Sequence, residues 1–256
     1  MRPGMSGDPN LISIVCPMKN EAENVALMVE DIARDCAVMG DFELILVDDG
    51  STDDTAAKIV ELQATYPWLR LIQHAGSGGQ SAAIHSGVHA ARGAICATLD
   101  GDGQNPPNQI PILVAAFRVE SVSDRLGLVA GQRVGRQDTA SKKWASKAAN
   151  RIRQFVLKDK TRDTGCGLKA FRRDAFLGLP FFNHMHRYLP ALFARDGWEI
   201  AHRDVTHRER AAGSSNYSNF QRAIVGVTDL IGVAWLIRRR KRVAPLERPR
   251  SETPHD

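Results

Sequence analysis

Roughly the first hundred residues alternate between apolar runs and segments of helical period, and this alternation constrains the fold most strongly. Short runs in which nearly every residue is apolar are typical of strands buried on both faces of a parallel sheet. Parallel strands need a crossover between them, and the helical segments supply it in right-handed units. The sequence therefore predicts an α/β fold with an open, mostly parallel sheet flanked by helices. The expected strands span residues 11–16, 42–49, 69–74 and 94–100.

The helices between these strands are expected to begin at polar caps. Asn20 and Glu23 resemble a capping pair for a helix that reaches Asp35. Ser51 is expected to cap a helix over residues 52–65, and acidic residues 53 and 54 favour its positive end. Further helices are expected to end near residue 91 and to span residues 106–120, 138–158, 185–195 and 218–240. Further strands are expected over residues 126–134, 167–171 and 198–202.

The composition is that of a globular chain with a core of its own. The chain has 256 residues, of which 43% are hydrophobic and 25% charged. These values exclude wholesale disorder, a collagen-like repeat and a disulfide-stapled miniprotein. The four cysteines form no C-x-x-C pair, so reduced and mostly buried thiols are expected.

Acidic segments follow three of the expected strands. They are PMKNE at residues 17–21, DDGS at 48–51 and DGDGQ at 100–104. Open α/β sheets bind ligands beyond the carboxyl ends of their strands. Carboxylates that meet there raise one another's pKa unless a cation separates them. Oxygen ligands suit Mg²⁺ or Mn²⁺, so Asp100 and Asp102 are candidate ligands of such an ion.

Several other motifs are absent from the sequence. DGDGQNPP has Asn105 and Pro111 where a calcium loop needs glycine and glutamate. The GSGG segment at residues 76–79 lacks the third glycine of a dinucleotide fingerprint and follows the third strand. No phosphate-binding loop or nucleophile elbow occurs. A GTPase, a dehydrogenase and an α/β-hydrolase are therefore excluded.

The motif series resembles the family-2 glycosyltransferases of the GT-A fold, in particular the polyprenyl-phosphate hexosyltransferases of the dolichyl-phosphate mannosyltransferase type. DDGS followed by D-x-D about fifty residues later is typical of GT-A, and the ordered series through Tyr217 is specific. The matching segments are PMKNE, LVDDGSTDDT, GSGGQSAAIHSGVHAARG, LDGDGQNPP, GQRVGRQD, RDTGCGLKAFRRDA, MHRYLPAL and HRERAAGSSNY.

This resemblance implies a role for each matching residue. The donor nucleotide would contact Pro17, Glu21, Asp48, Asp49 and Asp100. A Mg²⁺ or Mn²⁺ ion on the diphosphate would be held by Asp100, Asp102 and Gln104. The acceptor phosphate would be held by Arg133, Arg136, Lys142, Lys143 and Arg210. The residues expected to matter most for catalysis are Asp102, Arg133 and Arg210, and residues 163–167 would lie near the donor sugar.

The reaction implied by the resemblance is inverting transfer of a hexose from GDP-mannose or a UDP-hexose to polyprenyl (dolichyl or undecaprenyl) phosphate. A phosphate monoester is already ionised at pH 7, so it can attack the anomeric carbon without a strong base. Two alternatives stay open: a family-2 transferase with a saccharide or other hydroxyl acceptor, and a nucleotide-sugar-binding subunit that depends on a membrane partner. Asn216 stands where the group often has lysine, which bears on the acceptor contact.

The C-terminal region is expected to form an interfacial helix. The apolar stretch at residues 223–237 is shorter than the ~20 residues that a spanning helix needs. Its helical stripe would pack on the catalytic domain or lie on a membrane, and the basic run from Arg238 to Arg242 suits anionic lipid. The stripe comprises Phe220, Ile224, Val227, Ile231 and Trp235.

The expected organisation is a disordered N-terminus over residues 1–10, a catalytic domain over 11–205, an acceptor loop and membrane-interface helix over 206–242, and a disordered tail over 243–256. The net charge of +5 permits an anionic partner, and the segment between Ser218 and Arg242 is the expected contact with an anionic membrane surface. No signal peptide is expected. The protein is expected to be cytoplasmic and peripheral on the cytoplasmic face of the membrane, with room for a membrane-protein partner and no nucleic acid.

Overall fold

The computed structural model describes residues 7–134, 151, 153–157, 161–206, 208, 219–240 and 243, with the backbone alone described at 219–225. Residues 151 and 153–157, within the helix predicted over 138–158, are helical. The predicted acceptor ligands Arg136, Lys142, Lys143 and Arg210 lie outside the described residues.

A seven-stranded sheet forms the centre of the described part of the chain, in the order β3-β2-β1-β4-β6-β5-β7. Neighbouring strands run parallel except β6, which is antiparallel to both β4 and β5. The predicted α/β class and mostly parallel sheet are therefore confirmed. The strands are β1 (Asp8–Met18), β2 (Phe42–Asp48), β3 (Leu69–Gln73), β4 (Gly93–Thr98), β5 (Leu126–Arg133), β6 (Lys169–Arg172) and β7 (Glu199–Val205). Because β1 begins at Asp8, the boundary expected at residue 10 lies inside a strand.

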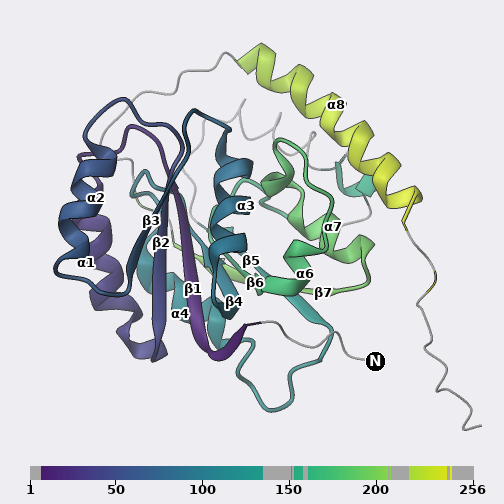
Figure 1. Cartoon of the computed structure of the whole chain (residues 1–256). Coiled ribbons are helices and arrows are strands. Elements are labelled where there is room, and N and C mark those ends of the chain that lie inside the picture. The colour runs from purple at the N-terminus through teal and green to yellow at the C-terminus, as the bar shows by residue number, and fades with distance from the viewer. Residues whose placement is uncertain are drawn as a thin grey trace, which may run out of the picture.

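Helices cover both faces of this sheet (Figure 1). The α-helices are α1 (Val25–Cys36), α2 (Thr55–Gln63), α3 (Gln80–Ala90), α4 (Ile110–Ala115), α6 (Arg173–Leu177), α7 (Leu189–Arg195) and α8 (Asn219–Arg238). Short 3-10 turns are η1 (Ala37–Met39), η2 (Pro107–Gln109) and η3 (Met185–Arg187). The sequence did not predict α6.

Two of the predicted helix caps are wrong. Helix α1 begins after Asn24, and Asn20 has a positive φ of 54° instead of a capping conformation. Ser51 caps no helix, because α2 begins only at Thr55. The role predicted for Asp53 is confirmed, since its carboxylate accepts a 3.1 Å hydrogen bond from the backbone N–H of Thr55 in the first turn of α2. Asn20 and Ser51 connect two loops at the candidate site instead.

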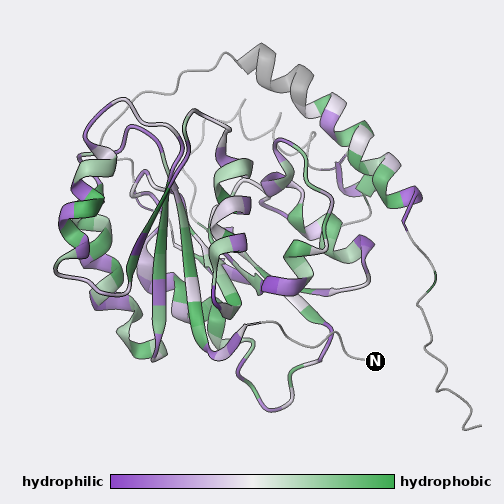
Figure 2. Cartoon of the chain, in the orientation of Figure 1, coloured by the Kyte–Doolittle hydropathy of each residue, from purple (hydrophilic) through white to green (hydrophobic). Residues whose placement is uncertain are grey.

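The two faces of the sheet belong to two apolar clusters, because successive strand residues point to opposite sides. In β1, Ile14 and Cys16 join a cluster with α1, α2 and α4, whereas Val15 joins a cluster with α3, α6, α7 and α8. Leu46 and Val47 in β2 divide in the same way. Hydrophobic residues accordingly dominate the central strands in Figure 2. All four cysteines are buried free thiols, as predicted.

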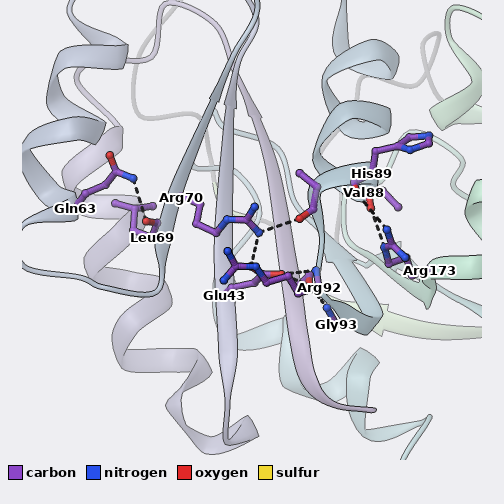
Figure 3. A network of polar contacts seen from close by, with 11 residues as sticks. Glu43, Gln63, Leu69, Arg70, Val88, His89, Arg92, Gly93 and Arg173 are labelled. Carbon is purple, nitrogen blue, oxygen red and sulfur yellow. Dashed lines mark hydrogen bonds and ion pairs between the residues drawn. The ribbon is translucent and has the colours of Figure 1, made fainter. Parts of the chain in front are cut away.

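A buried carboxylate joins three elements at the edge of the sheet where β2 begins (Figure 3). Glu43 accepts hydrogen bonds from the Ser13 hydroxyl at 2.7 Å and the Arg92 backbone N–H at 2.7 Å, and Arg70 pairs with it at 2.6 Å. The Arg70 guanidinium also donates to the carbonyl of Ala90. Burial raises the pKa of Glu43, but these hydrogen bonds outweigh burial and lower the pKa overall.

We expect Glu43→Gln to destabilise the fold by about 3 kcal/mol at pH 7, because it leaves Arg70 without its charge partner. The folded pKa of Glu43 lies below the unfolded value of about 4.3, so the stabilisation is complete above that value and disappears as the pH falls through the folded pKa. Urea unfolding at pH 7 and at pH 3 measures this, with Glu61→Gln on an exposed face of α2 as the control. An equal loss of unfolding free energy for both variants at pH 7 would contradict the stabilising role assigned to Glu43.

Candidate active site

The loops that follow β1 and β2 are hydrogen-bonded into one unit. Backbone N–H groups of Asn20 and Glu21 donate to the hydroxyls of Ser51 and Thr55 at 2.9 and 3.0 Å. The Asn20 side chain accepts the backbone N–H of Thr52 at 2.8 Å. Both predicted donor segments, from Pro17 and from Asp48, thus lie together at the carboxyl ends of their strands. The Glu21 carboxylate accepts the side-chain amide of Asn24 at 2.5 Å.

Asp49 holds the glycine-rich loop that precedes α3. Its two carboxylate oxygens accept hydrogen bonds of 2.8 Å from His74, Ser77 and the backbone N–H groups of Gly78 and Gly79. Burial raises the pKa of Asp49, but these donors outweigh it and lower the pKa overall. The carboxylate is therefore ionised at neutral pH and fixes the start of α3.

Asp48, the last residue of β2, is fully buried. Its carboxylate accepts the backbone N–H of Ser51 at 2.9 Å and the side-chain amide of Gln73 at 3.1 Å. Gly50, which follows Asp49, has a φ of 69° and packs against Gly76. A Cβ on Gly50 would lie 2.8 Å from the Gly76 carbonyl carbon. Only glycine fits this close approach without strain.

Asp100 and Asp102 follow β4 at the same edge of the sheet. Asp100 accepts the side-chain amides of Gln80 at 2.7 Å and Asn105 at 2.9 Å, and Asp102 accepts the backbone N–H of Gln104 at 3.2 Å. Burial is the main cause that raises the pKa of Asp100; the Lys169 ammonium opposes this rise and the Asp102 carboxylate adds to it. Two close carboxylates, both only partly exposed, form a site that favours a divalent cation.

The buried thiol of Cys16 lies within the electrostatic influence of three of these acids. Burial raises the pKa of Cys16, and the carboxylates of Asp100, Asp102 and Glu21 raise it further. The structure thus brings the acidic residues of the first and fourth strand ends to one place. Among the described residues, no group of three or more His, Cys, Asp or Glu side chains could hold a metal by itself. A metal here would need the Gln104 amide or a ligand from outside the protein.

The antiparallel strand β6 brings further charged residues to this edge. Because β6 runs opposite to its neighbours, its first residue, Lys169, pairs with Thr98 and Ala130 near the carboxyl ends of β4 and β5. Lys169 is buried, its ammonium donates to the carbonyl of Cys166, and burial lowers its pKa. Lys169 was not predicted as a site residue, although a lysine inside the apolar GLKAF run is a signal of a buried charge.

Arg133 ends β5 and is held by Asp163. Two parallel contacts join the guanidinium to the carboxylate, Nε to Oδ2 at 2.6 Å and Nη2 to Oδ1 at 2.9 Å. This hydrogen-bonded partner raises the pKa of Arg133. Such a fork fixes the plane of the guanidinium. The segment predicted to lie near a sugar therefore orients the predicted phosphate ligand.

Comparison with known proteins identifies sequence relatives. Residues 13–178 match the family model described as glycosyl transferase family 2. Over 241 residues, the chain is 35% identical to dodecaprenyl-phosphate galacturonate synthase of Rhizobium johnstonii, a match that covers 90% of this chain and 68% of the relative.

Solved structures with the same fold include two groups of glycosyltransferases. Glucosyl-3-phosphoglycerate synthase from Mycobacterium tuberculosis, in complex with Mn²⁺, UDP and glucosyl-3-phosphoglycerate, gives a TM-score of 0.63 at 20% identity, with 89% of this chain and 79% of that chain covered. A mannosyltransferase from Pyrobaculum calidifontis, in complex with GDP-Man and Mn²⁺, gives 0.62 at 17% identity over 91% and 65% of the two chains. These likenesses establish the GT-A fold.

Proposed function

This chain belongs to glycosyl transferase family 2, and from that premise we propose that it transfers a sugar from a nucleotide sugar to a polyprenyl phosphate. The observation that carries the proposal is the 35% identity, over 90% of the chain, to a synthase whose product is a sugar on a polyprenyl phosphate. The arrangement of acids and arginine at one sheet edge agrees with it.

The acidic residues at the carboxyl ends of β1, β2 and β4 form the proposed donor site. Pro17 and Asp48 lie at the carboxyl ends of β1 and β2, and Glu21 and Asp49 lie in the two connected loops that follow. The base and ribose would bind there. Mg²⁺ or Mn²⁺ would be held by Asp100, Asp102 and Gln104, with diphosphate oxygens and water completing its coordination. When bound, the ion supplies positive charge that stabilises the departing nucleoside diphosphate. Related folds in complex with Mn²⁺ and UDP support this assignment.

Arg133 at the end of β5 and basic residues further along the chain are the proposed acceptor site. A phosphate monoester is ionised at pH 7 and attacks the anomeric carbon once it is positioned, so no strong base is needed. Arg133 lies near Asp100 and is oriented by Asp163, which suits it to hold an acceptor oxygen close to the donor. Arg136, Lys142, Lys143 and Arg210 are proposed as further phosphate ligands. In-line attack inverts the anomeric configuration.

An acceptor pair that differs only in the phosphate tests this proposal. The purified protein is incubated with Mn²⁺, a sugar donor, and either a short polyprenyl phosphate or the corresponding polyprenol. We expect release of nucleoside diphosphate to rise only with the phosphate. Equal stimulation by the polyprenol, or stimulation by saccharide acceptors alone, would favour a hydroxyl acceptor and contradict the proposal.

We also propose that α8 rests on an anionic membrane surface at the cytoplasmic face. One side of α8 packs on the domain through Val233, and Asp229 pairs with His184 at 3.1 Å. The other side exposes an apolar stripe, and the exposed basic run from Arg238 to Arg240 follows it. Helix α8 lies along the outside of the domain (Figure 1). The stripe comprises Val227, Ile231 and Trp235, which are 58%, 65% and 58% exposed.

The exposed stripe belongs to the set singled out in the sequence, whose members Phe220 and Ile224 have no described side chains. None of the described helices is long and apolar enough to span a bilayer. An apolar face followed by arginines fits shallow insertion of Trp235 among headgroups and attraction of anionic lipid to the basic run.

Ile231→Ser with Trp235→Ser should lower partitioning onto phosphatidylglycerol vesicles at least about tenfold, because two large apolar side chains no longer leave water. Vesicle flotation measures the bound fraction. The control is Val38→Ser with Val119→Ser, two valines exposed elsewhere on the domain. Equal flotation of the wild type and the α8 variant would refute the membrane contact.

A further inference from the structure

The segment that leaves β7 is attached to the loop that carries the candidate metal ligands. The backbone N–H of Arg208 donates to the carbonyl of Gln104 at 2.9 Å. Two residues earlier, the backbone N–H of Thr206 donates to the side chain of Gln109 at 3.3 Å. One hydrogen bond therefore joins the segment after β7 to the metal loop, defined here as Asp100 to Gln104, and a second joins it to the end of η2.

The side chain of Arg208 fixes this segment to helix α1. Its Nη1 lies 2.9 Å from Oδ2 of Asp31, a carboxylate of which the side chain is only 10% exposed. The other oxygen of Asp31 binds Arg34 at 2.6 Å, and Arg34 is itself 63% exposed. Burial raises the pKa of Asp31, but the hydrogen bonds from Arg208 and Arg34 outweigh it and lower the pKa overall. A nearly buried carboxylate in the body of the domain thus serves as the anchor.

We propose that Arg208 and Asp31 form a clamp that ties the metal loop to α1 and so positions the candidate metal ligands. The proposal rests on the proposed function, because it assigns Gln104 to the metal. Arg208 is a positioning residue: its guanidinium holds the segment so that its backbone N–H meets the Gln104 carbonyl. The Gln104 backbone is thereby held next to Asp102.

The carboxylate of Asp31 provides a matched comparison, since each of its oxygens binds one arginine side chain. Arg208→Ala breaks the clamp, whereas Arg34→Ala removes the other cation and leaves the metal loop untouched. We expect Arg208→Ala to weaken Mn²⁺ binding in the presence of UDP about tenfold, as removal of a group that supports metal ligands typically does. Electron paramagnetic resonance of free Mn²⁺ measures this without turnover.

Arg208→Lys should restore part of the lost Mn²⁺ affinity, because a lysine can still pair with Asp31. Asp31→Asn should match Arg208→Ala, and the double variant should be no worse than either. Thermal unfolding verifies that each variant folds. If Asp31→Asn does not fold, the comparison of Arg208→Ala with Arg34→Ala still tests the clamp.

Two results would overturn the clamp: equal Mn²⁺ affinities for Arg208→Ala and Arg34→Ala, or fully additive losses in the double variant. Failure of the acceptor assignment is distinguishable, because wild-type protein would then bind Mn²⁺ with UDP and form no glycolipid. A wild type that binds no Mn²⁺ with UDP would overturn both proposals.

Discussion

Asp102→Asn should lower kcat/KM by about a thousandfold, which corresponds to about 4 kcal/mol of lost transition-state stabilisation. The change removes one negative charge from the proposed metal site. It retains a side-chain oxygen that can accept the Gln104 backbone N–H, now accepted by Asp102 at 3.2 Å, so the loop should keep its shape. Steady-state kinetics at several Mn²⁺ concentrations measure the loss, and thermal unfolding should change little.

The control for this variant is Asp54→Asn, the same chemical change at an exposed residue at the start of α2. We expect it to keep nearly full activity. Full activity of the wild type after removal of divalent metal by a chelator would contradict the metal-dependent mechanism. Full activity of Asp102→Asn would remove Asp102 from the site.

Gly167→Ala should reduce kcat/KM by at least about a hundredfold, because displacement of a catalytic group by about 1 Å has effects of this size. A Cβ on Gly167 would lie 2.5 Å from Oδ1 of Asp100 and closer still to its other carboxylate atoms. Asp100 is short and is held by Gln80 and Asn105, so its carboxylate must leave its present position. Kinetics and direct Mn²⁺ binding should show the loss together.

Gly178→Ala is the matched control, since its nearest neighbour would be the Asp174 carbonyl oxygen at an ordinary 3.6 Å and its φ is −77°. We expect this variant to remain within about threefold of the wild type. Comparable activity of Gly167→Ala and the wild type would mean that Asp100 tolerates displacement and is no metal ligand.

The sheet could be predicted because continuous apolar runs have one stable arrangement, a strand buried between two layers of helices. The position of Asp48, Asp49 and Asp100 at the same ends of the strands could be predicted too, because each lies at or just after the end of a parallel strand. Their individual roles remain predictions, as do those of the acceptor residues. Helix starts were predicted less well, because Asn20 and Ser51 bind each other's loops, and local cap patterns carry no information about such long-range partners.

The contributions of β6 and of Arg208 could not be predicted from local patterns. Lys169 reaches the site only because β6 runs antiparallel between two parallel neighbours, and a short apolar run does not reveal its direction. Asp31 belongs to the buried face of α1 and resembles any helical aspartate in sequence. Its partner lies 177 positions further along the chain, so only the fold brings the two together.

The central claim, transfer of a sugar to a lipid phosphate, is tested most directly by measuring both products of one reaction. The purified protein is incubated with Mn²⁺, a short polyprenyl phosphate, and a panel of UDP- and GDP-sugars that includes UDP-galacturonate. We predict that one donor yields nucleoside diphosphate and extractable glycolipid in a one-to-one ratio. Release of nucleoside diphosphate without glycolipid, for every donor in the panel, would contradict the claim.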